Sequence, residues 1–86
     1  MKVKFQKSFT GQFKRLSETK KQLATDTIEL FTADPMNDSL RNHPLKDKWV
    51  NYRSITANDD LRLHYRVIDK DTALFVAVDT HYELYR

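Results

Sequence analysis

Polar and apolar side chains alternate over residues 60–67, and this alternation constrains the fold more than any other feature of the chain. The apolar positions are Leu61, Leu63, Tyr65 and Val67. Successive side chains of a β-strand point to opposite faces, so the segment predicts a strand with one apolar and one polar face. The polar face carries Asp60, Arg62 and His64. We therefore expect a sheet with one face packed on a core.

Further strands are predicted on either side of this segment. Residues 73–78 are continuously apolar, which is typical of a strand buried on both faces. Residues 49–55 are predicted to form the strand before residue 60, with a turn at Asn58-Asp59. A second turn is expected at residues 69–71. Residues 2–6 alternate as well, with Val3 and Phe5 on one face, and predict an amphipathic first strand.

Two helices are predicted between the first strand and the other three. Apolar residues recur at helical spacing over residues 8–17 and again over residues 23–31. Thr19 and Gln22 are expected to form a capping box at the start of the second helix. Asp34-Pro35 is expected to end it, because the residue before a proline avoids helical geometry.

The order of these elements, β-α-α-β-β-β, predicts an α+β fold. We expect a mostly antiparallel four-stranded sheet with a helical hairpin on one face, leaving the other face for function. Residues 34–47 are expected to be a loop. With 86 residues, the chain is predicted to form one domain over residues 1–86.

Several function classes are disfavoured by residue content. The chain has no cysteine, which excludes disulfides and thiolate metal sites. Its three histidines lack the spacing of a helical zinc motif, and its only glycine, Gly11, provides no phosphate-binding loop. No cofactor and no metal are expected. The absence of a signal-like or membrane-length apolar run predicts a cytoplasmic protein without a membrane partner.

Positive charge gathers at the start of the chain. Net charge is +3, yet residues 1–21 hold seven Lys or Arg and one acidic residue, Glu18. Four of the seven basic residues are Lys14, Arg15, Lys20 and Lys21. A basic end suggests a polyanionic or acidic partner, and an ordinary solvated face is the alternative.

The C-terminal half contains the residue types that metal-free RNA cleavage requires. That reaction needs a base for the ribose 2′-OH, a cation for the phosphate and an acid for the leaving oxygen. The candidates are His43, Asp60, Arg62, His81 and Tyr85. Structural alternatives remain open: a loop histidine at 43, an exposed Asp60–Arg62 ion pair, a surface His64, and aromatic packing at the chain end.

Four ordered segments resemble the RelE superfamily of bacterial toxins, most of all its YafQ-like messenger-RNA interferases. The segments are NHPLKDKW (42–49), YRSI (52–55), DLRLHY (60–65) and THYELY (80–85). This resemblance implies the toxin of a type II toxin-antitoxin system, which cleaves messenger RNA on the translating ribosome. It further implies a 2′,3′-cyclic phosphate and a 5′-OH as products, inhibition by a cognate antitoxin, and contact with operator DNA only through that antitoxin.

By position, His43, Asp60, His81 and Tyr85 match active-site residues of the family, and Arg62 matches a phosphate-stabilising arginine. We expect His81 and Asp60 to form the proton-transfer pair and His43 to be a second acid/base or orienting group. Tyr85 is expected to stack on a base or to contact the leaving group. Ribosomal or messenger RNA is expected to contact Lys14, Arg15, Lys20, Lys21 and Arg53.

Three positions depart from the family pattern: Thr56 stands where some members have a histidine, Leu61 replaces a tryptophan, and Asp79 replaces a glycine. Two other functions therefore remain alternatives. One is a ParE-like, non-enzymatic inhibitor of DNA gyrase, and the other is a catalytically degenerate member that only binds an antitoxin.

Overall fold

The computed structural model describes the backbone of residues 1–85 and the side chains of residues 1–84. Its elements are β1 (Lys2–Phe5), α1 (Lys7–Lys14), α2 (Glu18–Ala33), the 3-10 helix η1 (Asp38–Leu40), β2 (His43–Pro44), the 3-10 helix η2 (Asp47–Trp49), β3 (Arg53–Thr56), β4 (Leu61–Asp69), β5 (Thr72–Thr80) and α3 (His81–Tyr85). The five strands form one sheet in the order β1-β5-β4-β3-β2. Only β1 and β5 pair in parallel within that sheet.

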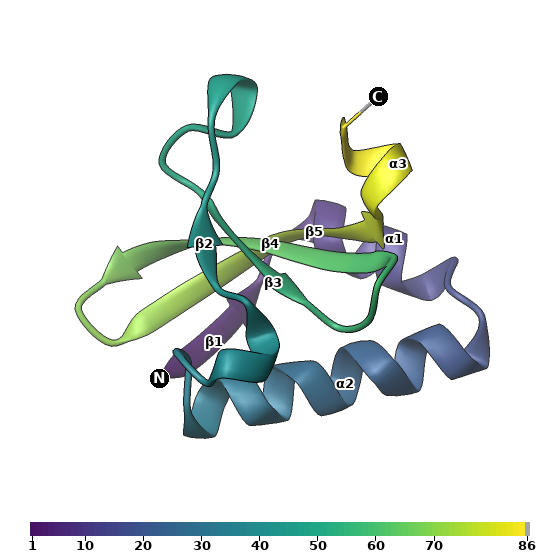
Figure 1. Cartoon of the computed structure of the whole chain (residues 1–86), viewed down its shortest axis with the longest axis horizontal. Helices are drawn as coiled ribbons and strands as arrows, with labels where there is room; N and C mark the ends of the chain where they lie inside the picture. The colour runs from purple at the N-terminus through teal and green to yellow at the C-terminus, as the bar shows by residue number, and fades with distance from the viewer. Residues whose placement is uncertain (86) are drawn as a thin grey trace.

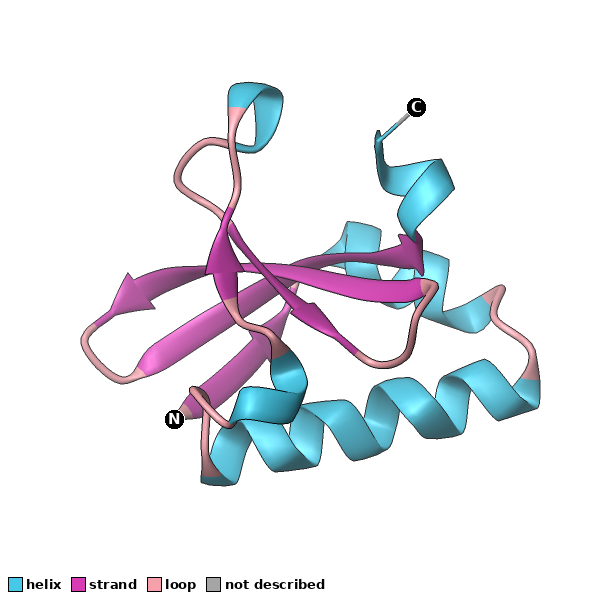
Figure 2. Cartoon of the chain, viewed as in Figure 1, coloured by secondary structure: helices cyan, strands magenta, loops and turns pink. Residues whose placement is uncertain are grey.

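Helix α2 runs along one face of the sheet, whereas the η2 segment and α3 project from the opposite side (Figure 1). Figure 2 shows the same arrangement by element type, with the strands between these two groups of helices. The predicted α+β class, the order of the elements and the mostly antiparallel sheet are confirmed. The sheet has five strands instead of four, because residues 43–44 add a short edge strand within the segment predicted to be a loop.

The main core lies between the helices and the sheet. Phe31 of α2 is fully buried there, with its ring centroid 4.8 Å from that of Tyr65 and 5.3 Å from that of Phe75. Both contacts are edge-to-face, an arrangement that aromatic pairs favour. The apolar positions of β4 that the alternation predicted, Leu61, Leu63 and Tyr65, belong to this core. Val67 does not, since it is 50% exposed near the end of the strand.

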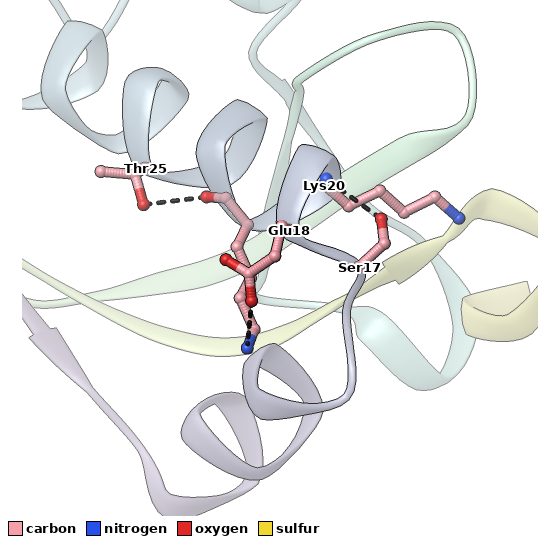
Figure 3. Close-up of polar contacts among 5 residues, drawn as sticks. Ser17, Glu18, Lys20 and Thr25 are labelled. Atoms are coloured by element: carbon pink, nitrogen blue, oxygen red, sulfur yellow. Dashed lines mark hydrogen bonds and ion pairs between the residues drawn. The ribbon is translucent and has the colours of Figure 1, made fainter.

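Helix α2 begins differently from the sequence prediction. Ser17 is its N-cap, and the Ser17 hydroxyl accepts a hydrogen bond from the Lys20 N–H at 3.3 Å (Figure 3). The predicted capping box of Thr19 and Gln22 is wrong, because Gln22 instead donates to Asp26 one turn further along the helix. The helix ends at Ala33, as the Asp34-Pro35 pair predicted.

The predicted strand over residues 49–55 starts late. Trp49 lies in η2, and β3 begins at Arg53. Asp47 and Asn51 have positive φ angles of 55° and 76°, a conformation that interrupts an extended strand. The chain therefore turns twice before the sheet resumes, which raises Trp49 above the sheet.

The sheet face opposite α2 is also partly covered, contrary to the expectation that it would be left bare. Val76 and Ala77 of β5 pack there with Leu84 of α3, and Trp49 and Tyr52 pack against them. The Trp49 indole Nε1 donates to the Leu84 carbonyl at 3.4 Å, so η2 and α3 are joined over this face.

Strand β1 pairs only with the first part of β5, and helix α1 lies along the remaining edge of β5. The Ser8 hydroxyl donates to the Val76 carbonyl at 2.7 Å, and the Val78 N–H donates to the Gln12 side-chain oxygen at 3.0 Å. These side chains satisfy strand groups that would otherwise be exposed at an edge. Among the described residues, no helix combines the length and the apolarity that crossing a membrane requires.

Candidate active site

A row of paired residues crosses the sheet on the face opposite α2, hereafter the site face. His43 of β2 pairs with Ser54 of β3, Ser54 pairs with His64 of β4, and His64 pairs with Ala77 of β5. Directly paired residues of antiparallel strands place their side chains on the same face. Two imidazoles that are 21 positions apart in sequence therefore share one face, separated by a small serine.

The next row of the site face carries Arg62. It pairs with Thr56 on one side and Asp79 on the other. The Arg62 Nη1 group donates to the Asn58 carbonyl at 2.6 Å and to the Leu61 carbonyl at 3.3 Å. Within the described residues no ion pair joins Arg62 to Asp60, so the guanidinium is held against the β3–β4 turn by backbone carbonyls.

Asp60 and His81 meet where β4 begins and β5 ends. The His81 N–H donates to the Asp60 carbonyl at 2.7 Å. Both residues are exposed. One backbone hydrogen bond thus joins the main chains of two residues whose side chains are expected to form the proton-transfer pair.

His64 is fully buried on the site face beneath Trp49. The two ring centroids are 4.5 Å apart in an edge-to-face contact. Burial, together with the nearby charges of His43, His81 and Arg62, lowers the pKa of His64 from 6.5 to about 4. The imidazole is therefore neutral at physiological pH.

His43 is exposed at the sheet edge and is held in one orientation. Its Nδ1–H donates to the Arg41 carbonyl at 2.7 Å, since a carbonyl can only accept. Arg41 has a φ angle of 49°, in the left-handed region, which turns its carbonyl toward the ring. In the neutral tautomer that this bond selects, the Nε2 lone pair of His43 is available to accept a proton.

The remaining predicted site residues lie elsewhere. Lys14, Arg15, Lys20 and Lys21 lie around the α1–α2 connection, and Lys21 forms an ion pair with Glu18 at 3.5 Å (Figure 3). Arg53 is paired with the core residue Tyr65, so it belongs to the face of the sheet opposite the site face. Its Nε donates to the Asn42 side-chain oxygen at 2.7 Å. The side chain of Tyr85 lies outside the described residues.

The sequence interpretation underestimated two members of this site. Alternation placed His64 on the correct face, but a surface position was the favoured alternative, and its complete burial contradicts that alternative. Trp49 was placed in a strand, whereas it covers His64 from η2. A histidine within an alternating strand was the available signal, yet its burial depends on a segment that precedes it by 15 positions.

No group of three or more His, Cys, Asp or Glu side chains suited to a metal ion occurs in the part of the chain that the structure describes. The arrangement provides an imidazole with an oriented lone pair at His43, a guanidinium at Arg62, and an aspartate and a histidine whose main chains are hydrogen-bonded, Asp60 and His81. Such groups can accept a proton, stabilise a phosphate and return a proton, which are the three requirements of metal-free RNA cleavage.

Comparison with known proteins identifies the family of the chain. The family model described as the bacterial toxin of type II toxin-antitoxin systems, YafQ, matches residues 1–86. A search of curated proteins gave no match.

Three solved structures illustrate the likeness. The structure of YafQ from Escherichia coli has a TM-score of 0.82 at 18% identity, covering 98% of this chain and 97% of that chain. A conserved hypothetical protein from Helicobacter pylori has a TM-score of 0.72 at 26% identity, covering 99% of each chain. YafQ in the Escherichia coli DinJ-YafQ complex has a TM-score of 0.71 at 22% identity, covering 98% and 97%. With its whole length matched by the family model, this chain belongs to the YafQ family of bacterial toxins of type II toxin-antitoxin systems.

Proposed function

We propose that this toxin is a metal-independent endoribonuclease that cleaves messenger RNA on the translating ribosome. The observation that supports the proposal is the strand pairing, which puts His43, His64 and Arg62 on one face of the sheet. Asp60 and His81 are joined by a backbone hydrogen bond where β4 begins and β5 ends. A protein that only binds a partner needs no such set of proton-transferring groups.

The proposed reaction uses these groups in turn. Asp60 and His81 form the proton-transfer pair, one group taking the 2′-OH proton and the other protonating the departing 5′-oxygen. His43, with its Nε2 lone pair oriented by Arg41, is a second acid/base or orienting group. Arg62 stabilises the phosphate, and Tyr85 contacts a base or the leaving group. Attack by the 2′-oxygen on the adjacent phosphorus expels the 5′-oxygen, giving a 2′,3′-cyclic phosphate and a 5′-OH.

We further propose that a cognate antitoxin covers an apolar groove between β1, α1 and α2. The groove has a volume of 520 Å³ and is lined by Phe5, Phe9, Phe13 and Ile28 among others, with Lys14 at its wall. Phe5 is 44% exposed there. An acidic antitoxin segment with apolar side chains complements both features, and Escherichia coli YafQ has been solved in complex with DinJ. Contact with operator DNA would then occur only through the antitoxin.

Mapping of transcript ends after induction tests the enzymatic proposal. New cuts within translated regions are expected. Growth arrest with DNA damage and intact transcripts would instead support a ParE-like gyrase inhibitor, and the absence of any growth effect would support a degenerate member. Either outcome would overturn the endoribonuclease proposal.

The site assignment is tested by His81→Ala. Loss of a positioned acid or base is expected to reduce the cutting rate by about 100-fold or more. Thr19→Ala, on the exposed surface of α2, is the control and is expected to cut at the wild-type rate. Equal rates for His81→Ala and the wild type would refute the assignment.

A further inference from the structure

A cavity of 340 Å³ lies on the site face beside the candidate active site. Its floor is formed by Val76 and Ala77 of β5, and its walls come from α1, from the η2 segment with Tyr52, and from α3. Its volume lies at the lower end of the roughly 300–1,000 Å³ that is usual for small-molecule sites. Three segments distant in sequence thus enclose a space large enough for a small planar ligand.

The cavity and the candidate active site share their boundary. Ala77, on the floor, is the direct strand partner of His64. Trp49, in the wall, covers the His64 ring. Leu84, also in the wall, lies one turn after His81 on α3. A nucleic-acid strand with a phosphate at Arg62 and His81 would therefore have an adjoining nucleotide at the mouth of this cavity.

Two amide side chains in the cavity wall are oriented by the protein itself. Gln12 uses its oxygen to accept from the Val78 N–H at 3.0 Å. Gln6 uses its Nε2 group to donate to the Ser8 hydroxyl at 2.9 Å. Within the described part of the chain, these bonds leave the two Nε2–H donors of Gln12 and the Oε1 acceptor of Gln6 available to a ligand.

The chemistry of the wall favours a nucleobase over an anion. Lys48 and Glu83 contribute opposite charges, which gives an anion no net attraction. A base is planar and uncharged, and its edge carries donors and acceptors that glutamine amides recognise. Unstacked RNA bases also contact aromatic side chains, of which Trp49 and Tyr52 are present here.

We propose that this cavity receives a base of the RNA strand next to the cleaved phosphate, with Gln12 and Gln6 contacting the base edge. This inference rests on the proposed ribonuclease function and adds a determinant of sequence preference to it. Because the amides are already fixed by the bonds to β5 and Ser8, little ordering is needed when a base binds.

Fluorescence of the single tryptophan, Trp49, reports binding directly. The purified full chain is titrated separately with the four nucleoside 5′-monophosphates and with ribose 5-phosphate, which lacks a base. At least one nucleotide is expected to change the fluorescence in a saturable manner, whereas ribose 5-phosphate is not. The proposal is wrong if no nucleotide changes the signal, or if ribose 5-phosphate changes it equally.

The variant Gln12→Glu sharpens the test. It keeps an oxygen to accept from the Val78 N–H but removes both amide donors, so the fold is retained while the base loses its partner. We expect the nucleotide affinity to fall about tenfold or more, as when a site loses a hydrogen bond to its ligand. Gln22→Glu makes the same change on α2, outside the cavity, and is expected to bind nucleotides as the wild type does. Equal affinity in Gln12→Glu and Gln22→Glu would overturn the proposal.

The two proposals fail in distinguishable ways. Saturable, Gln12-dependent nucleotide binding without transcript cuts would reject the ribonuclease function and retain a base-binding cavity. Transcript cuts whose flanking bases are unchanged in Gln12→Glu, together with no nucleotide-dependent fluorescence, would retain the ribonuclease and reject the cavity as its base subsite.

Discussion

Burial of His64 links the stability of the protein to pH. In the folded chain the pKa of this imidazole is lowered to about 4, chiefly by burial, whereas an unfolded histidine titrates near 6.5. Between these two values the unfolded chain binds the extra proton and the folded chain does not. A neutral His64 therefore contributes stability above pH 6.5, and that contribution is lost as the pH falls toward 4.

We expect the free energy of unfolding to decrease by up to about 3 kcal/mol between pH 6.5 and pH 4 because of this one group. Urea denaturation across this pH range measures the effect. His64→Gln removes the titrating group, so its unfolding free energy is expected to vary less over the same range. An identical pH dependence in the variant would show that other groups are responsible.

Phe31 and Phe5 provide a second comparison at the scale of single residues. Phe31→Ala is expected to cost about 3–5 kcal/mol, because it leaves a cavity among Tyr65, Phe75 and the rest of the core. Phe5→Ala is expected to cost clearly less, since Phe5 is already 44% exposed. Thermal or urea unfolding gives both values, and equal losses would contradict the described core.

At the scale of elements, short polar contacts fix where helices and strands begin. Ser17 starts α2 by accepting from the Lys20 N–H. In the sheet, Asn58 organises the β3–β4 turn, where its side-chain oxygen accepts from the Asp60 and Leu61 N–H groups at 3.0 and 2.7 Å. That turn places Asp60 next to the His81 backbone, so the candidate site depends on a local side-chain contact.

The N-cap can be tested with a matched pair of variants. Ser17→Ala is expected to reduce the unfolding free energy by about 1 kcal/mol, because the hydroxyl satisfies an unpaired helix N–H. Thr19→Ala is expected to change it little, since this residue is not the cap. Urea denaturation measures the unfolding free energy of both variants. A greater decrease for Thr19→Ala than for Ser17→Ala would show that Thr19 is the N-cap, as the sequence predicted.

At the scale of the whole molecule, the basic cluster predicted from the N-terminal sequence and the candidate active site occupy different regions. The basic residues Lys14, Arg15, Lys20 and Lys21 lie around the α1–α2 connection, whereas the imidazoles lie on the site face. A chain arranged in this way can contact a large polyanion through one region while the other acts on a single strand. This division accords with the proposed work on the ribosome.

Charge reversal at those four positions is expected to weaken ribosome binding and to flatten its dependence on salt. If each residue neutralises one phosphate, the slope of log affinity against log salt should become smaller in magnitude by about 3–4. Reversal of Arg66 and Lys70, which are exposed near the β4–β5 turn, serves as the control. Unchanged slopes in the four-site variant would exclude these residues from the interface.

Local periodicity made most of the fold predictable. Alternation in β4, the apolar run of β5 and the apolar face of α2 each depend on neighbouring residues alone, and the structure retains all three elements. Segments that carry no period were predicted poorly: β2 has only two residues, and η2 interrupts a run that resembles a strand. Of the candidate site, residue types and the family resemblance indicated His43, Asp60, Arg62 and His81, but not how they meet.

The sequence by itself determined the order of the elements and which side chains of β4 face away from the core, because both follow from the geometry of a strand or helix over a few residues. Only the tertiary structure decided that His64 is buried, that Trp49 covers it and that His81 bonds to Asp60. Those outcomes require segments separated by 15 to 21 positions to pack together. Packing of that kind depends on the register of the strands and the path of the loops, which no local pattern encodes.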